Sequence, residues 1–325
     1  MKKLTMVQAI SDALRTALAT DPTVVVLGED VGKNGGVFRA TEGLWQEFGD
    51  ERVIDTPLAE AGIIGTSIGM AVNGLKPVPE IQFMGFIYPA FEQIVTHAAR
   101  LRTRTQGAFP ATLTIRAPYG GGIRAPELHC DSTESLFVHI PGLKVVTPST
   151  PYDAKGLLLA AIKDPDPVIF LEPMKLYRSV KQEVPDGWYE VPIGKARKVR
   201  DGEDVTLIAW GTMVPVAEAA ANEWAAKGVS CDVLDLRSLY PLDEEAIIES
   251  VKKTGRVVIV HEAPKTAGLA GELTALINEH AFLYLEAPIT RVTGYDAPVP
   301  MYALEDWFRP DAKRVSKAIQ QVVSF

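Results

Sequence analysis

The sequence contains little cysteine and has a deficit of basic residues. Only two cysteines occur, Cys130 and Cys231, with no paired spacing that could form a metal cage or a disulfide framework. The cysteine content favours a reducing compartment. The 33 lysines and arginines are outnumbered by 41 aspartates and glutamates, so the formal net charge is −8. This charge argues against nucleic acid as a partner, because binding to phosphates requires a surplus of basic residues.

Long apolar segments are also absent. No run reaches the roughly 18 apolar residues that a membrane span requires. Polar residues such as Asp12 and Arg15 interrupt any signal-peptide core near the N-terminus. The first 22 residues predict instead an amphipathic helix, whose apolar face consists of Val7, Ile10, Leu14 and Leu18. We expect a soluble, cytoplasmic protein without a membrane contact.

The pattern along the 325 residues predicts two α/β domains. Short apolar runs alternate with helical patterns, and they begin at Val24, Pro77, Thr112, Leu143, Pro167, Val205, Ser230, Arg256 and Pro288. Runs that are apolar on both faces are typical of a parallel sheet covered by helices on each side. A polar segment rich in proline and glycine separates the two groups of runs. We therefore predict two three-layer α/β/α domains with mainly parallel sheets, residues 1–190 and 191–325.

The segment Gly65–Gly69, GTSIG, matches the nucleophile elbow of serine hydrolases. An elbow requires a strand that runs directly into the turn at the serine, whereas Ser67 lies in the middle of a predicted helix, with Pro57 in its first turn. The small residues around Ser67 indicate close helix packing instead. A serine hydrolase using Ser67, with His261 after a later strand as its base, is the alternative of a different class.

Glu60 lies near the start of the same predicted helix, where the helix dipole stabilises a negative charge. A solvated acid is the simplest interpretation of such a position. However, Leu58, Ala59 and Ala61 form an unusually small and apolar neighbourhood for an exposed acid. If Glu60 is buried there, desolvation would raise its pKa and allow it to share a proton with a bound heterocycle.

The loop from Ala117 to Ser135 holds the other concentration of unusual residues. Three consecutive glycines, Gly120–Gly122, permit backbone conformations that other residues resist. His129 lies near the end of this loop, where it is either a structural hydrogen-bonding group or an acid–base group. Neighbouring Cys130 is expected to be a small buried residue and not a reactive thiol.

Several long runs together resemble one protein family over nearly the whole chain. They are LGEDVGKNGGVFRATEGL, RVIDTPLAEAGIIGTSIGMAVNGLKPVPEIQF, PELHCDS and PGLKVVTPSTPYDAKGLLLAAIKDPDPVIFLEP. These runs resemble the beta subunit of the thiamine-diphosphate-dependent 2-oxo acid dehydrogenase component, from pyruvate and branched-chain dehydrogenase complexes. The resemblance implies a transketolase-like pyrimidine-binding domain followed by a transketolase C-terminal-like domain that supports assembly. It also implies decarboxylation of a small 2-oxo acid on thiamine diphosphate and transfer of the acyl group to a lipoyl arm.

The resemblance also assigns roles to residues. Glu60 matches the glutamate that hydrogen-bonds the aminopyrimidine ring nitrogen of the cofactor, and His129 matches the loop histidine that assists acyl transfer to lipoate. Leu58, Gln82 and Phe86 match positions that contact the pyrimidine. The family often binds a potassium ion through main-chain carbonyls, which by position would be those of Leu113, Ala161, Asp164 and Asp166.

The Gly-Asp-Gly motif with which this family holds magnesium and the diphosphate is absent. The chain can therefore supply only half of the cofactor site, which implies an alpha subunit and an α2β2 heterotetramer. The resemblance further implies docking on the lipoyl acyltransferase core through its basic subunit-binding domain. We favour pyruvate as substrate, with branched-chain 2-oxo acids as the alternative. A non-catalytic assembly subunit is disfavoured because Glu60, Phe86 and His129 occur together.

Overall fold

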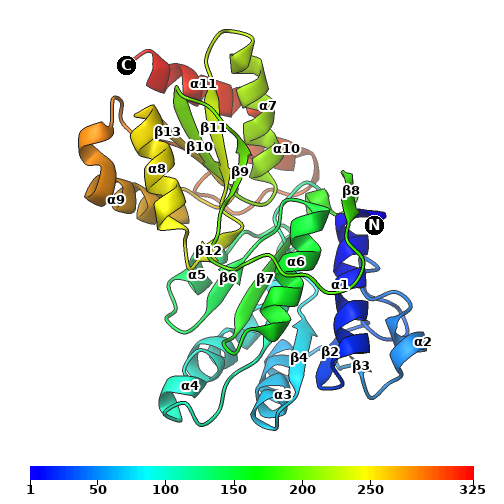
Figure 1. The fold of residues 1–325 in the computed structure, drawn as a ribbon. Helices are drawn as coiled ribbons and strands as arrows, with labels where there is room; N and C mark the ends of the chain where they lie inside the picture. The colour runs from blue at the N-terminus through cyan, green and yellow to red at the C-terminus, as the bar shows by residue number, and fades with distance from the viewer.

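The computed structural model describes residues 1–325 and contains two α/β units (Figure 1). Each unit has a sheet of mainly parallel strands with helices packed against it, which confirms the predicted fold class. No helix is both long enough and apolar enough to span a bilayer.

The first unit is built on a seven-stranded sheet in the order β12-β6-β7-β5-β4-β2-β3. Its strands are β2 (Val24–Gly28), β3 (Val53–Asp55), β4 (Lys76–Glu80), β5 (Thr114–Tyr119), β6 (Lys144–Val146), β7 (Val168–Pro173) and β12 (Ser238–Tyr240). All neighbouring pairs are parallel except β12 and β6. Because β12 comes from the second half of the chain, a segment beyond the predicted boundary completes the first sheet.

Helices cover both faces of this sheet, as the alternation of buried side chains along β7 demonstrates. Val168 and Phe170 pack in the cluster that contains α1 (Met6–Thr20) and α6 (Pro151–Lys163). Ile169 and Leu171 pack on the opposite face with α3 (Glu60–Val72) and α5 (Glu134–Val138). The shorter helices of this unit are α2 (Leu44–Phe48), η1 (Met84–Phe86), η2 (Tyr88–Ala90), the π-helix η3 (Gln93–Ala98), α4 (Leu101–Arg104) and η4 (Met174–Leu176).

The second unit has a five-stranded sheet in the order β14-β13-β10-β11-β9. Its strands are β9 (Arg197–Arg200), β10 (Val205–Ala209), β11 (Cys231–Asp235), β13 (Val257–Val260) and β14 (Thr290–Val292), and only β9 is antiparallel to its neighbour. Its helices are α7 (Met213–Ala225), α8 (Glu244–Thr254), α9 (Leu269–Ala281), η5 (Phe282–Tyr284), η6 (Tyr302–Leu304), α10 (Glu305–Phe308) and α11 (Ala312–Val323). One apolar cluster continues from α3 and α5 of the first unit into α8 and α9 of the second.

Two predicted helix starts are wrong by a few residues. The apolar face predicted for the first helix is buried as expected, but α1 begins only at Met6, after the strand β1 (Lys2–Thr5) that pairs with β8 (Lys181–Val184). Thr5 and Gln8 form a capping box that fixes this start. Pro57 lies before α3 and not in its first turn, because Ala59 has a non-helical backbone conformation and the helix begins at Glu60.

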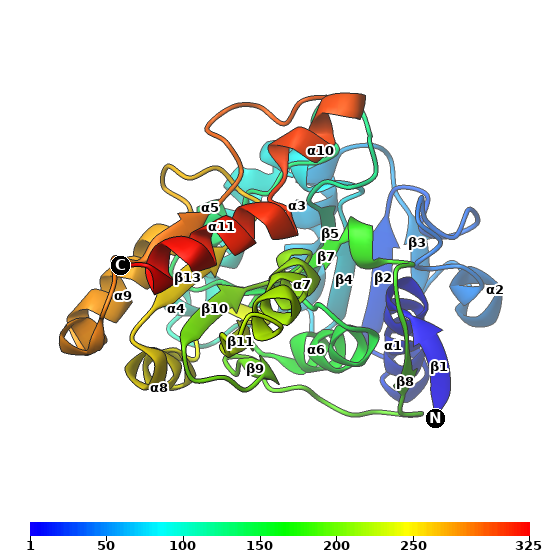
Figure 2. The same ribbon diagram turned by 90° about the horizontal axis from the view of Figure 1, so that it is seen from above.

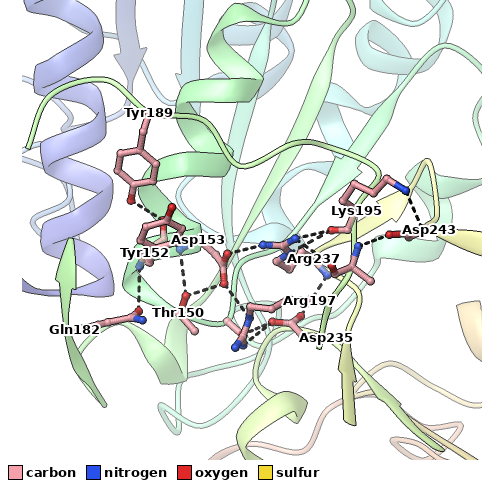
Figure 3. Close-up of polar contacts among 12 residues, drawn as sticks. Thr150, Tyr152, Asp153, Gln182, Tyr189, Lys195, Arg197, Asp235, Arg237 and Asp243 are labelled. Carbon is pink, nitrogen blue, oxygen red and sulfur yellow. Dashed lines mark hydrogen bonds and ion pairs between the residues drawn. The ribbon is translucent and has the colours of Figure 1, made fainter. Parts of the chain in front are cut away.

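Buried ion pairs join the two units near the start of α6 (Figure 3). The carboxylate of Asp153 accepts a hydrogen bond of 2.8 Å from Arg237 and lies 3.2 Å from Arg197, which also contacts Asp235 at 3.1 Å. Arg237 additionally donates to the main-chain oxygens of Lys195 and Ala196 at 3.0 and 3.1 Å. A single guanidinium therefore holds together α6, the linker and the strand β12 that follows it.

Replacing Arg237 with Met removes this connection and leaves Asp153 buried with one cationic partner. Because loss of one partner of a buried pair is strongly destabilising, we expect the free energy of unfolding to fall by about 3 kcal/mol in urea denaturation. Lys163→Met is the matched control, since its ion pair with Glu190 is exposed and such pairs contribute about 0–1 kcal/mol. Equal stability of the two variants would contradict the proposed importance of Arg237.

Candidate functional site

The predicted site residues lie at one edge of the first sheet. Glu60 follows β3, Gln82 and Phe86 follow β4, and His129 lies in the loop after β5. Because these strands are parallel, their carboxyl ends meet at the same edge, which is where ligands bind in open α/β sheets. The structure therefore places the segments that carry these residues at the same end of the sheet.

His129 and Phe86 belong to one aromatic cluster with Phe83. The imidazole centroid lies 4.4 Å from the Phe83 ring and 5.0 Å from the Phe86 ring, and the two phenylalanine rings are 5.5 Å apart. His129 Nδ1 is 2.9 Å from the main-chain oxygen of Glu127. Since a carbonyl oxygen can only accept, Nδ1 carries the proton and Nε2 is available for other partners. Sequence reasoning missed Phe83, which is buried beneath the two predicted residues.

A fully buried ionic network lies among the central strands. Arg116 on β5 donates to Glu80 at 2.7 Å and to Glu172 at 2.6 and 3.1 Å. Tyr177 donates to Glu172 at 2.6 Å. Burial raises the pKa of Glu80, while the two carboxylates outweigh the effect of burial on Arg116 and raise its pKa as well. The sequence patterns did not single out these residues, although a charged residue within each of three apolar runs indicates a buried ion pair.

Aromatic contacts connect this network with the cluster around His129. The Tyr177 ring lies 5.1 Å from the Phe38 ring, which lies 5.4 Å from the Phe83 ring. Phe83, which packs against His129, is therefore connected through Phe38 to Tyr177, and the hydrogen bond to Glu172 fixes the position of Tyr177.

Glu60 is the first residue of the 13-residue helix α3 and is partly exposed. A carboxylate at this position is stabilised by the free N–H groups of the helix start. Burial, then the charges of Asp30 and Glu60, raise the pKa of nearby Glu29. The site therefore presents two neighbouring acids, of which the sequence analysis singled out only Glu60.

The site is open in the single chain. Leu58 is 71% exposed, and Gln82 and Phe86 are only partly buried. The outward face of α3 consists of small exposed residues, namely Ala61, Gly62, Thr66 and Gly69. An exposed helix face made of small side chains allows another chain to approach the main chain closely.

The loop after β5 closes on itself and packs on the segment that carries Phe86. The Gly120 N–H donates to the Asp131 oxygen at 3.1 Å, and both Gly120 and Gly122 have positive φ, as the glycine-rich sequence predicts. A side chain at Gly85 would collide with the carbonyl oxygen of Leu128, so the main chain next to His129 lies directly on the η1 segment. Cys130 is buried, as predicted, and burial raises its pKa to about 11.

The structure contradicts a serine hydrolase that uses Ser67 and His261. Ser67 is fully buried within α3, and its hydroxyl donates to the Ile63 carbonyl at 2.8 Å. His261 lies in the second unit, stacked on Trp210 with ring centroids 5.2 Å apart, and neither of its ring nitrogens has a hydrogen-bond partner. Burial lowers the pKa of His261 to about 4. Neither group is positioned to activate the other.

No group of three or more His, Cys, Asp or Glu side chains forms a metal site. The expected potassium ligands are main-chain oxygens around the entrance to β5 and the turn between α6 and β7. Those of Leu113 and Ala161 accept N–H groups from Val168 and Asp164 at 2.9 and 3.1 Å, and each retains a free lone pair. Potassium binding there stays a prediction.

Comparisons with known proteins agree with this architecture. Residues 2–180 match the family model of the transketolase pyrimidine binding domain, and residues 194–315 match that of the transketolase C-terminal domain. A solved split-gene transketolase, described as an inactive beta4 tetramer, has a TM-score of 0.81 with 24% sequence identity over 99% of both chains, a likeness of fold alone.

Two curated relatives are similar over their whole length. The pyruvate dehydrogenase E1 component subunit beta of Bacillus subtilis is 52% identical over 100% of both chains. That of Acholeplasma laidlawii is 52% identical over 99% of this chain and 98% of its own. The chain belongs to the family of pyruvate dehydrogenase E1 component beta subunits.

Proposed function

We propose that the chain forms half of a thiamine diphosphate site and, with an alpha subunit, decarboxylates pyruvate and transfers the acetyl group to a lipoyl arm. The observation that carries the proposal is the packing of Phe86 against His129, with ring centroids 5.0 Å apart, at the edge of the first sheet where the helix that begins with Glu60 also starts. These groups fit an aminopyrimidine, which requires a carboxyl group for its ring nitrogen and an apolar surface for its face. Leu58 and Gln82 add an apolar and a polar contact beside them.

Each residue has a distinct role in this proposal. Glu60 would hydrogen-bond the pyrimidine ring nitrogen and exchange a proton with it, while a second chain that covers the open site would exclude water. Phe86 would pack on the ring, and His129 would donate or accept a proton during acyl transfer. When bound, thiamine diphosphate supplies the electron sink that decarboxylation of a 2-oxo acid requires.

The open side of the site supports an interface with an alpha subunit. The sequence lacks the Gly-Asp-Gly motif for magnesium and diphosphate, so we assign those ligands to the partner. The small exposed residues of α3 allow a second chain to approach Glu60 closely, and we propose an α2β2 heterotetramer. The net charge of −8 suits the basic subunit-binding domain of a lipoyl acyltransferase core. Two buried free cysteines and bacterial relatives support a cytoplasmic location.

Reconstitution tests the proposal directly. The isolated chain should not decarboxylate pyruvate, because it lacks the residues that hold the charged end of the cofactor. Addition of the alpha subunit, thiamine diphosphate and magnesium should restore turnover in a carbon dioxide release assay, with branched-chain 2-oxo acids as the competing substrates. Turnover by the isolated chain, or a preference for branched-chain substrates, would refute the assignment.

Glu60→Gln keeps the size of the side chain and removes its exchangeable proton. We expect pyruvate turnover of the reconstituted enzyme to fall by about 10²- to 10⁴-fold, the usual contribution of a positioned acid–base group. Thermal stability should change little, because Glu60 is partly exposed and forms no ion pair. Glu51→Gln, at an exposed acid before the amino end of β3 and away from the site, is the control. Unchanged turnover of Glu60→Gln would remove Glu60 from the mechanism.

Gly85→Ala tests the position of His129 without changing the histidine. The added methyl group collides with the Leu128 carbonyl and must displace the main chain beside His129. We expect reductive acetylation of a lipoyl domain to fall by about tenfold to a hundredfold, because small displacements of reacting groups have effects of this size. Decarboxylation measured with ferricyanide as electron acceptor should change much less. Gly271→Ala, where the new methyl group meets no atom, should leave both rates unchanged.

A further inference from the structure

Residues of the second unit contact the loop that carries His129 near its two ends. We call these ends, residues 120–124 and 130–131, the neck of the loop. This loop comprises residues 120–131 and is closed by the bond from Gly120 to Asp131. In Figure 2, α10 of the second unit lies at the top of the view beside this loop. We use the name clamp for Glu262, which follows β13, and for Glu305 and Arg309, which begin and follow α10.

The clamp binds main-chain donors on the first half of the loop. Glu262 accepts the Gly121 N–H at 2.8 Å. Glu305 accepts the N–H groups of Gly122 and Arg124, the latter at 2.6 Å. Three N–H groups within four residues are therefore satisfied by two carboxylates of the other unit.

Glu305 also contacts the second half of the loop. The Cys130 sulfur lies 3.9 Å from its carboxylate, and Cys130 is the residue next to His129. The carboxylate of Glu305 therefore contacts the loop both before His129, at Gly122 and Arg124, and directly after it, at Cys130.

The clamp residues are buried, and their charges compensate one another. Glu305 is 1% exposed, Glu262 is 6% exposed and Arg309 is 9% exposed. Arg309 donates to Glu262 at 2.5 Å and so compensates the buried negative charge. Any side chain at Gly121 would collide with Glu305 and Arg309, so the main chain fits directly against the clamp.

The backbone of the loop needs such support. Arg124 and Leu128 have φ angles of 54° and 66°, a left-handed conformation that residues with a side chain disfavour. Conformations of this kind persist where surrounding contacts fix them, and they are frequent at functional sites.

We propose that Glu305, supported by Glu262 and Arg309, is a positioning residue for His129, so that the second unit contributes to acyl transfer as well as to assembly. This inference rests on the proposed function, which gives His129 its role in that step. The clamp reaches the histidine only through the main chain of the loop. Its loss should therefore affect transfer to the lipoyl arm far more than decarboxylation.

The test uses the reconstituted enzyme with Glu305→Gln. Amide hydrogen exchange of residues 120–131, measured by mass spectrometry, should become about tenfold faster, because charged hydrogen bonds to the loop are weakened. Reductive acetylation of a lipoyl domain should fall by about tenfold or more, while ferricyanide-coupled decarboxylation stays within about twofold. Asp306→Asn is the matched control, because Asp306 bonds the exposed side chain of Arg124, at 2.6 Å, and no main-chain group of the loop.

A second variant approaches the same contact from the loop. Gly121→Ala sets a methyl group against the side chains of Glu305 and Arg309, which forces the loop and these side chains apart without removing either carboxylate, and it should reproduce the separation of the two activities. Assembly with the alpha subunit and bound thiamine diphosphate are measured for each variant to verify folding.

The possible results distinguish a failure of the clamp proposal from a failure of the proposed function. Unchanged exchange in Glu305→Gln would refute the clamp, and faster exchange with an equal loss of both activities would refute its positioning role. If His129→Ala transfers acetyl groups at the normal rate, the role of His129 in the proposed function fails, whereas the exchange result still decides whether the clamp exists.

Discussion

A guanidinium without access to water lies among three strands of the first sheet, and the arrangement of the candidate site depends on how its charge is satisfied. Removal of a charge from water is unfavourable unless the charge is paired and hydrogen-bonded. Glu80 and Glu172 provide both the opposite charge and the hydrogen bonds for Arg116. These contacts require β4, β5 and β7 to keep their register at the edge where the site lies. The buried charge thereby fixes the segments that carry Phe86 and His129.

Two further sets of contacts connect the Arg116 network and the second unit to the proposed site residues. Successive ring contacts lead from the network to His129, through Tyr177, Phe38 and Phe83. From the other side, main-chain contacts with Glu305 hold the loop that presents the histidine. Glu60 is placed separately, by the start of α3. The residue proposed for proton exchange and the residue proposed for acyl transfer are thus supported by different parts of the fold.

Sequence patterns predicted the parts of the fold that depend on local periodicity. The apolar runs that became β2, β4, β5 and β7 are recognisable because both of their faces are buried. The strands β1, β3, β8, β9 and β12 were missed because none of them is buried along its whole length, so none shows a continuous apolar run. Glu60, Phe86 and His129 could be named from a family resemblance. Glu60 also lies near the start of a predicted helix, and His129 lies in a glycine-rich loop after a predicted strand. Glu305 could not, because it is 181 residues from Arg124 and only the folded chain brings them together.

The central claim is that this chain provides the proton-exchanging half of a cofactor site shared between two subunits. An experimental structure of the assembled enzyme with thiamine diphosphate bound measures this directly, through the separation between the Glu60 carboxyl group and the pyrimidine ring nitrogen. We predict a hydrogen bond of about 2.6–3.2 Å at a subunit interface. A Glu60 carboxyl group that points into bulk solvent, away from the cofactor, would contradict it.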